Sequence, residues 1–159
     1  MLSVVIAIQC DFETSVGKVI GFVDAATPNV KQWLGVPFAE PPVNSLRFLP
    51  PVPKFNIGEI NAQKPPPSCQ QYRTTLPDIF NQAVPEFLHP GPYDEDCLYL
   101  NVIAPKNPKS HALPVLVWIH GGMTTFGGIN TLYETRLPTV HREYRGVRYL
   151  RCDTAFVSS

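Results

Sequence analysis

The sequence has little charge and no excess of either sign. Charged residues make up 16% of its 159 residues, and 13 lysines and arginines balance 13 aspartates and glutamates. Such a chain generates no overall field that would attract nucleic acid or an anionic membrane surface, so we expect neither as a partner. It also has no run approaching the roughly 18 apolar residues that a membrane-spanning helix needs. We therefore expect a soluble chain that forms one globular domain, whole or partial.

Cysteine is scarce and is not spaced for metal binding. The four cysteines form no Cys-x-x-Cys pair and have no nearby histidine at zinc spacing. We therefore expect no metal site and no cofactor. The N-terminal segment MLSVVIAIQC lacks the positively charged residues and the small-residue cleavage site of a signal peptide, so we interpret Ser3–Ile8 as a buried strand.

Three runs rich in β-branched or aromatic residues follow one another near the N-terminus. They span Val4–Ile8, Val16–Val23 and Val30–Val36, and polar or turn-forming segments separate them around Asp11–Ser15 and Asp24–Asn29. This pattern predicts an antiparallel meander.

Proline is abundant, and it is concentrated in one region. Of the 18 prolines, 13 lie between Pro37 and Pro92. Each removes a backbone donor and fixes φ, so the region is predicted to be mostly loop, with a helical turn or two near Asp78–Ala83. A loop of this length is usually functional or disordered.

Two further strands are predicted at Cys97–Ala104 and Pro114–Ile119. The second is a near-continuous apolar run of the kind that is buried on both faces, which places it at the centre of a sheet. His120-Gly121-Gly122 follows it directly, and Gly127-Gly128 comes shortly after. In open α/β sheets, ligands bind outside the carboxyl ends of the strands. Taken alone, the glycines are equally compatible with a tight turn.

Three segments together resemble the type B carboxylesterases and cholinesterases. PVLVWIHGG is similar to the strand and oxyanion loop of the α/β-hydrolases, Gln32–Pro51 (QWLGVPFAEPPVNSLRFLPP) resembles the family's first signature, and Glu95–Val102 (EDCLYLNV) resembles its second. They occur in the family's order, and the resemblance covers about Gly17 to Tyr133. It implies an α/β fold, an incomplete α/β-hydrolase with N-terminal antiparallel strands and the first central strands of the sheet.

The resemblance implies an oxyanion hole in the glycine loop. Gly122 and Met123 would supply two backbone N–H groups, Gly121 would shape the loop, and a third donor would follow the nucleophile. Glycine suits this loop because backbone donors must approach the negative charge of a tetrahedral intermediate closely. Met123 departs from the family, which usually has a third glycine. The change can add strain or crowd the acyl pocket.

The resemblance also implies two long-range links. Arg47 would form a salt bridge with Glu95, and Cys69 would form a disulfide with Cys97 along one wall of the active-site gorge. The alternatives are two independent exposed charges and two buried thiols. Tyr72, shortly after the first of these cysteines, is a candidate for the same wall.

The catalytic triad itself is not expected in these residues. The sequence contains no Gly-x-Ser-x-Gly, and in this fold the order is serine, acid, histidine, so His89, His111, His120 and His141 come too early to be the base. We expect residues 1–133 to be the N-terminal part of a carboxylesterase domain. Residues 134–159, with five arginines and no clean period, are expected to be a divergent basic tail outside the native fold.

These inferences predict an N-terminal fragment of a serine carboxylic-ester hydrolase that has no turnover alone. The full-length parent would act on a small ester and would be secreted, as the family's disulfide implies. Two alternatives remain: a non-catalytic, esterase-like interaction protein, with which Met123 is compatible, and a truncated product without function.

Overall fold

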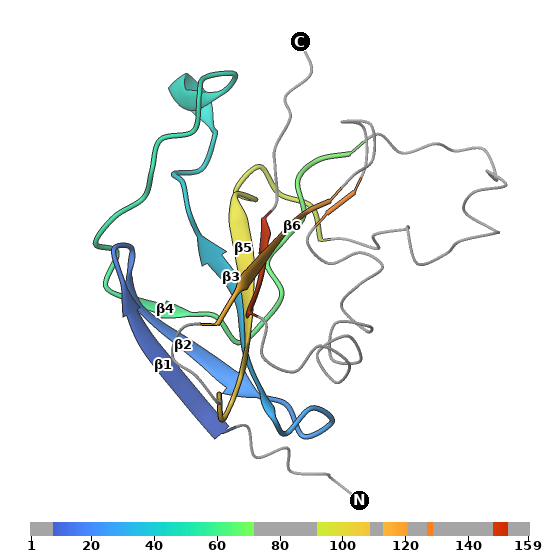
Figure 1. Ribbon diagram of the computed structural model, residues 1–159. Coiled ribbons are helices and arrows are strands. Elements are labelled where there is room, and N and C mark those ends of the chain that lie inside the picture. The colour runs from blue at the N-terminus through green and yellow to red at the C-terminus, as the bar shows by residue number, and fades with distance from the viewer. Residues whose placement is uncertain (1–7, 72–91, 109–112, 121–126, 129–147, 153–159) are drawn as a thin grey trace, which may run out of the picture.

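The computed structural model describes residues 8–71, 92–108, 113–120, 127–128 and 148–152. They form a seven-stranded sheet with the order β1-β2-β3-β5-β7-β6, and β4 pairs with β2 outside this path (Figure 1). Most neighbouring strands are antiparallel, and the parallel pairs are β2 with β4 and β6 with β7. The strands are β1 (Ile8–Thr14), β2 (Gly17–Val23), β3 (Val30–Pro37), β4 (Glu59–Asn61), β5 (Tyr99–Pro105), β6 (Val115–Ile119) and β7 (Arg148–Cys152), and η1 (Asn44–Leu46) is one 3₁₀ turn.

The predicted meander is confirmed, but its first strand lies later in the sequence than expected. β1 pairs antiparallel with β2 along its whole length, from Ile8 opposite Val23 to Thr14 opposite Gly17. Most of the segment Asp11–Ser15, expected to be a turn, is therefore strand. The expected strand Ser3–Ile8 overlaps β1 only at Ile8, and residues 3–7 lie outside the described residues.

Alternating burial explains why β1 forms where it does. Cys10 is buried and Phe12 is half-buried, whereas Asp11 and Glu13 are exposed, which is the period of two expected of a half-buried strand. At the turn, the hydroxyl oxygen of Thr14 accepts hydrogen bonds from the backbone N–H groups of Val16 and Gly17. Each nitrogen lies 3.2 Å from Thr14 Oγ1.

The core lies where the β1–β2 hairpin packs against β3. The Phe12 and Trp33 rings meet edge to face, with centroids 4.9 Å apart at an interplanar angle of 86°. Gly21 makes this packing possible, because a Cβ there would lie 2.3 Å from the carbonyl oxygen of Gln32 and 2.4 Å from Trp33 Cδ1. Other buried members of the same cluster are Cys10, Val19, Val36, Ile60 and Ala62.

A buried amide joins β3 to β5. The β3–β5 register shifts between Trp33 and Val36, and Gly35, within this irregularity, has a φ of +80°, which favours glycine. Its N–H group donates to Asn101 Oδ1 at 2.9 Å, and Asn101 is buried. This bond satisfies a backbone group that the irregular ladder leaves without its regular partner.

The proline-rich region is mostly irregular where the structure describes it, as predicted. Besides the single turn η1, the exception is β4, which pairs in parallel with β2 through Lys18–Glu59, Val19–Ile60 and Ile20–Asn61. It was not expected because, of its three residues, only Ile60 is apolar and buried. The predicted helical turn at Asp78–Ala83 lies outside the described residues.

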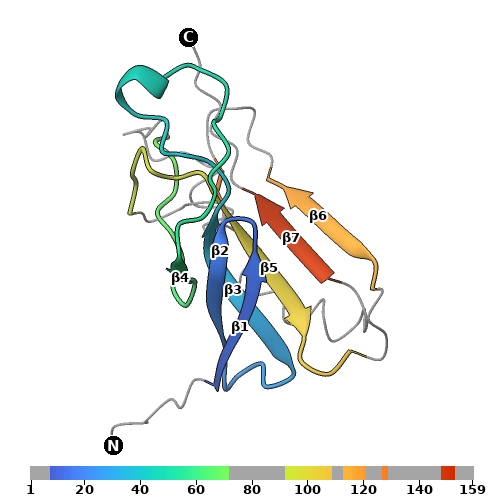
Figure 2. The same cartoon turned by 90° about the vertical axis from the view of Figure 1, so that its left-hand side faces the viewer.

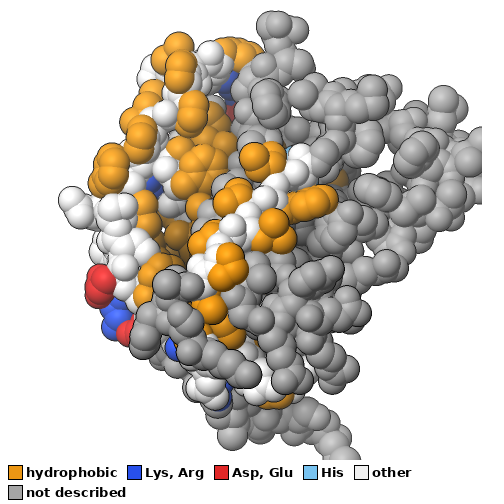
Figure 3. Space-filling model, in the orientation of Figure 1, with side chains coloured by type: hydrophobic (Ala, Val, Ile, Leu, Met, Phe, Trp, Pro, Cys, Tyr) orange, Lys and Arg blue, Asp and Glu red, His pale blue; other side chains and the backbone are white. Residues whose placement is uncertain are grey.

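β6 forms as predicted, but at the end of the strand order instead of its centre. Its one neighbour among the described strands is β7, and its five residues, Trp118 included, are between 39% and 59% exposed. Orange side chains along β6 form a visible apolar stripe in Figure 3. The apolar run indicates an environment buried on both faces, which the described residues do not supply.

β7 lies within the segment expected to be outside the fold. Arg148–Cys152 pairs with β5 on one side and with β6 on the other, as Figure 2 shows. The pairing uses backbone hydrogen bonds, and a strand of five residues is too short for its side chains to reveal a reliable period.

Candidate active site

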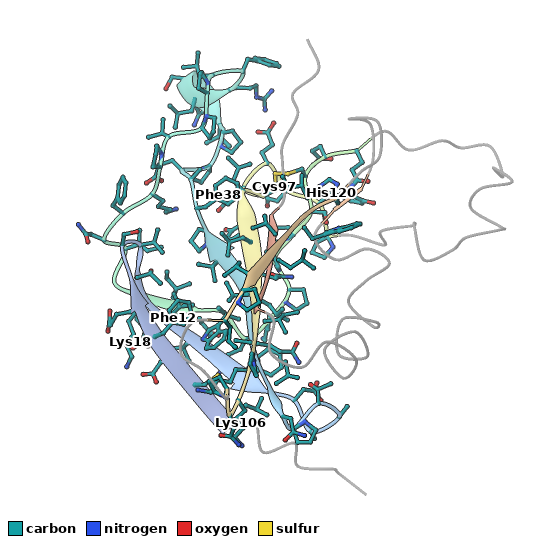
Figure 4. The ribbon with its side chains drawn as sticks, viewed as in Figure 1. Phe12, Lys18, Phe38, Cys97, Lys106 and His120 are labelled. Carbon is teal, nitrogen blue, oxygen red and sulfur yellow. A yellow bond between two sulfur atoms is a disulfide. The ribbon has the colours of Figure 1, made fainter. Side chains whose placement is uncertain are left out.

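The strand register brings the end of β6 to the beginning of β5. Leu100 pairs with Cys152, and Cys152 pairs with Ile119, so these residues form one row across β5, β7 and β6. His120 directly follows β6, and Cys97 lies two residues before β5 begins, so both belong to the same end of the sheet (Figure 4). This is the carboxyl end of β6, where the fold places ligands.

The predicted oxyanion residues Gly121, Gly122 and Met123 lie outside the described residues. The structure describes both boundaries of their loop. His120 is half-buried at the end of β6, and Gly127 and Gly128 are the nearest described residues on the other side. The geometry of the loop can therefore be assessed at its ends.

Gly127 and Gly128 pack against the segment Ser68–Gln71. Gly127 has a φ of +119°, a conformation that side chains disfavour. Its N–H group donates to Gln71 Oε1 at 3.1 Å, and its carbonyl oxygen accepts from Gln71 Nε2. Gly128 is buried, and a Cβ there would lie 2.8 Å from Ser68 Oγ. Both glycines are thus required by local geometry.

The segment that holds the glycines is itself fixed at two points. Ser68 donates its N–H to the carbonyl oxygen of Pro92 and accepts from the N–H of Asp94, both at 3.0 Å. Cys69 is joined to Cys97 by a disulfide, with 5.0 Å between their Cα atoms. Cys97 is buried beside Ala39 and Leu98. The disulfide therefore attaches the segment to the residues that lead into β5.

Arg47 and Glu95 form an ion pair across a sequence separation of 48 residues. The hydrogen bond and charge of Glu95 raise the pKa of Arg47. Both side chains are nearly half exposed, at 48% and 41%, so solvent screens their attraction. The ion pair therefore contributes little to the free energy of folding and mainly fixes the relative position of the two segments. It connects the residue after η1 to the segment before Cys97.

Tyr99 has the most perturbed acid–base chemistry near this end of the sheet. Burial raises its pKa to about 12, with further contributions from Asp96 and Asp94, because the phenolate would face two carboxylates. The phenol therefore remains protonated throughout the physiological range. It can act as a hydrogen-bonding group but not as a base.

Four other residues singled out from the sequence cannot be placed relative to this site. Tyr72, His89, His111 and His141 lie outside the described residues. Among the residues that the structure describes, no cluster of three or more histidine, cysteine, aspartate or glutamate side chains is arranged to hold a metal ion. The same residues include no helix with the length and hydropathy needed to cross a bilayer.

Sequence reasoning missed Gln71 and Ser68. Their importance arises from contacts with glycines 56 and 60 residues away in the sequence. No local pattern distinguishes Gln71 from the adjacent Gln70. A glutamine two residues after a disulfide-bonded cysteine does not by itself predict a contact with a distant loop. Only the folded structure identifies the contact of Gln71 with Gly127.

The fold and the site define the first part of an α/β-hydrolase. The carboxylesterase family model matches residues 9–140, most of the chain, and the chain belongs to this family. The match begins earlier and ends later than the segment Gly17–Tyr133 that the sequence motifs indicated.

Curated relatives agree with the family. The chain is 44% identical to chlorogenic acid esterase of Aspergillus niger over 126 residues. This alignment covers 77% of the chain and 25% of the relative. It is 42% identical over 137 residues to carboxylesterase 1E of Mus musculus, covering 81% of the chain and 24% of the relative. Secreted lipase 5 of Gibberella zeae is 35% identical over 152 residues, or 84% of the chain and 28% of that protein. The chain thus spans about a quarter of the length of these relatives.

The solved structure of a thermophilic PNB esterase has the same fold over most of the chain. The two superpose with a TM-score of 0.73 at 31% identity, over 94% of this chain and 29% of the esterase. The predicted fold class, an incomplete α/β-hydrolase with N-terminal antiparallel strands, is therefore confirmed.

Proposed function

We propose that this chain supplies the oxyanion-hole loop and one wall of the active site of a serine carboxylic-ester hydrolase. The observation that carries the proposal is the position of the two described boundaries of the glycine loop. It begins at the carboxyl end of β6, beside the entry to β5, and its far end is held by Gln71 through both backbone groups of Gly127.

In the proposed reaction, a serine from outside these 159 residues attacks an ester carbonyl and forms an acyl-enzyme, which water then hydrolyses. The backbone N–H groups of Gly122 and Met123 stabilise the oxyanion as charge develops. A backbone donor is retained when glycine is replaced by methionine, so the Met123 side chain affects the acyl pocket more directly than the donor set. The substrate is a small carboxylic ester.

The Cys69–Cys97 disulfide supports an extracellular location for the complete enzyme. Disulfides persist in oxidising compartments, and Cys69–Cys97 closes a segment next to the proposed site. The similarity to a protein named as a secreted lipase points in the same direction.

The proposal is tested by comparing the 159-residue chain with the longer protein obtained by extending its reading frame. Both are assayed for hydrolysis of a short-chain p-nitrophenyl ester, with and without a serine-directed fluorophosphonate. We expect inhibitor-sensitive turnover from the longer protein alone. Turnover by the 159-residue chain would contradict the division of residues proposed here.

A non-catalytic interaction protein is the second candidate, and Met123 at the position of a family glycine favours it. The same experiment separates the two functions. A folded longer protein that neither turns over the ester nor reacts with fluorophosphonate would support the non-catalytic function and would refute the hydrolase.

A further inference from the structure

We infer that Gln71 is a positioning residue that sets the far end of the oxyanion loop. The inference rests on the proposed function and assigns a role to a side chain that no sequence motif identified. It concerns Gln71 and Gly127 directly, and the proposed donors Gly122 and Met123 through the chain that connects them to Gly127.

The side-chain amide of Gln71 forms a hydrogen bond with each of the two peptide groups that flank the Cα of Gly127. Its Oε1 accepts from Gly127 N at 3.1 Å, and its Nε2 donates to the carbonyl oxygen of the same residue. Two bonds to one residue fix both the position and the orientation of the backbone there, as a strand neighbour would. A carboxamide is the shortest side chain that offers a donor and an acceptor in this planar arrangement.

The conformation of Gly127 makes such a support necessary. Its φ of +119° is accessible to glycine, but glycine also has the greatest backbone freedom of all residues. Without an external partner, the chain at this point would sample many orientations. The Gln71 amide selects one of them, so that entropy is lost on folding and not during each catalytic cycle.

The support is rigid because Gln71 follows the disulfide by two residues. Cys69 is bound to Cys97, and the adjacent Ser68 is fully buried, with backbone hydrogen bonds to Pro92 and Asp94. Ser68 Oγ also lies where a Cβ on Gly128 would be, at 2.8 Å. The segment Ser68–Gln71 therefore both holds the loop end by hydrogen bonds and packs closely against it.

This geometry gives the loop a defined end only four residues after Met123. A displacement of about 1 Å at reacting groups can cost on the order of 100-fold in rate even when its cause is remote. Loss of the Gln71 amide is therefore expected to weaken stabilisation of the transition state more than binding of the ground state.

The test uses the longer protein and the variant Gln71→Met, which keeps the side-chain length and removes both hydrogen bonds. Its matched control is Gln63→Met, because Gln63 Nε2 also donates to a glycine carbonyl oxygen, that of Gly21, at 3.2 Å but away from the loop. We expect Gln71→Met to lower kcat at least about tenfold with KM within about twofold. A trifluoromethyl ketone, which forms a tetrahedral oxyanion with the serine, should lose affinity by a similar factor. The control should lie within about twofold of the wild type in all three quantities.

Gln71→Glu is a second variant that keeps one of the two bonds. Its carboxylate still accepts from Gly127 N but sets a second oxygen, and no donor, against the carbonyl oxygen of Gly127, so its kcat should also fall at least about tenfold. This variant decides the question if Gln71→Met does not fold.

The outcomes are distinguishable. A folded wild type without ester hydrolysis refutes the proposed function and, with it, this inference. An active wild type whose Gln71 variants match the Gln63 control in kcat and in trifluoromethyl ketone affinity refutes the inference alone. A rise in KM matched by an equal fall in kcat/KM, with kcat unchanged, would also refute it, because that pattern indicates a role in substrate binding.

Discussion

The exposed apolar strand β6 predicts that the 159-residue chain self-associates. All five side chains are 39–59% exposed, so roughly half of the area of each remains available for burial. Full burial of a large apolar side chain is worth about 1.5–3 kcal/mol. Covering β6 with a second copy is therefore expected to contribute on the order of 4–8 kcal/mol before the costs of association are subtracted. The edge of β6 that no described strand pairs adds hydrogen bonds to this attraction.

Val117→Lys is the perturbation that should reverse this behaviour. A lysine in the middle of an edge strand opposes pairing, because its charge would have to be buried between two sheets. The matched control is Val52→Lys, since Val52 is also exposed, at 43%, but lies outside the strands. Sedimentation velocity across a range of concentrations should show oligomers for the wild type and the control, and a larger monomer fraction for Val117→Lys.

Two results would refute this reasoning. One is a wild-type chain that stays monomeric at all concentrations and unfolds cooperatively in calorimetry. The other is an equal response to Val117→Lys and Val52→Lys, which would show that added charge, and not the β6 edge, controls solubility.

Three further predictions concern the same chain kept monomeric by the β6 lysine. Gly21→Ala should lower the free energy of unfolding in urea by about 1–3 kcal/mol, because its Cβ has no room against β3; an unchanged midpoint would contradict the core packing. Reduction of Cys69–Cys97, which are 28 residues apart, should cost about 3.6 kcal/mol by the loop-entropy relation, and equal stability with and without reductant would argue against the link. Burial raises the pKa of Tyr99 to about 12 in the folded chain, whereas the pKa of an unfolded tyrosine is about 10. The stability that Tyr99 contributes is therefore complete below about pH 10 and is lost as the pH rises through about 12. Ultraviolet titration should show that Tyr99 ionises late.

The strands that pattern reasoning located best are those with long apolar runs. The runs at Val16–Val23 and Val30–Val36 correspond closely to β2 and β3, because β-branched residues bounded by turn formers carry the signal locally. The strand character of residues 11–14 was missed because the alternation of Cys10 and Phe12 with acidic residues was interpreted as a turn. β4 has too few residues to produce any pattern.

The position of β6 could not be obtained from its sequence. An apolar run reports that a strand is suited to burial, but the neighbours that bury it are set by the whole sheet. Within the described residues it has β7 on one side, and β7 itself was not expected in the sheet. For the site, the ordered motifs located the glycine loop, whereas the Gln71–Gly127 contact depends on folding across 56 residues and required the structure.

The central claim is that the backbone N–H of Met123 stabilises the oxyanion of an ester hydrolase, and its removal is the most direct test. Met123→Pro eliminates that donor, and Met123→Gly retains it. In the longer protein, with folding verified by circular dichroism, we predict that Met123→Pro lowers kcat by about 100- to 1,000-fold while Met123→Gly stays active. A folded Met123→Pro enzyme with the wild-type kcat would contradict the claim.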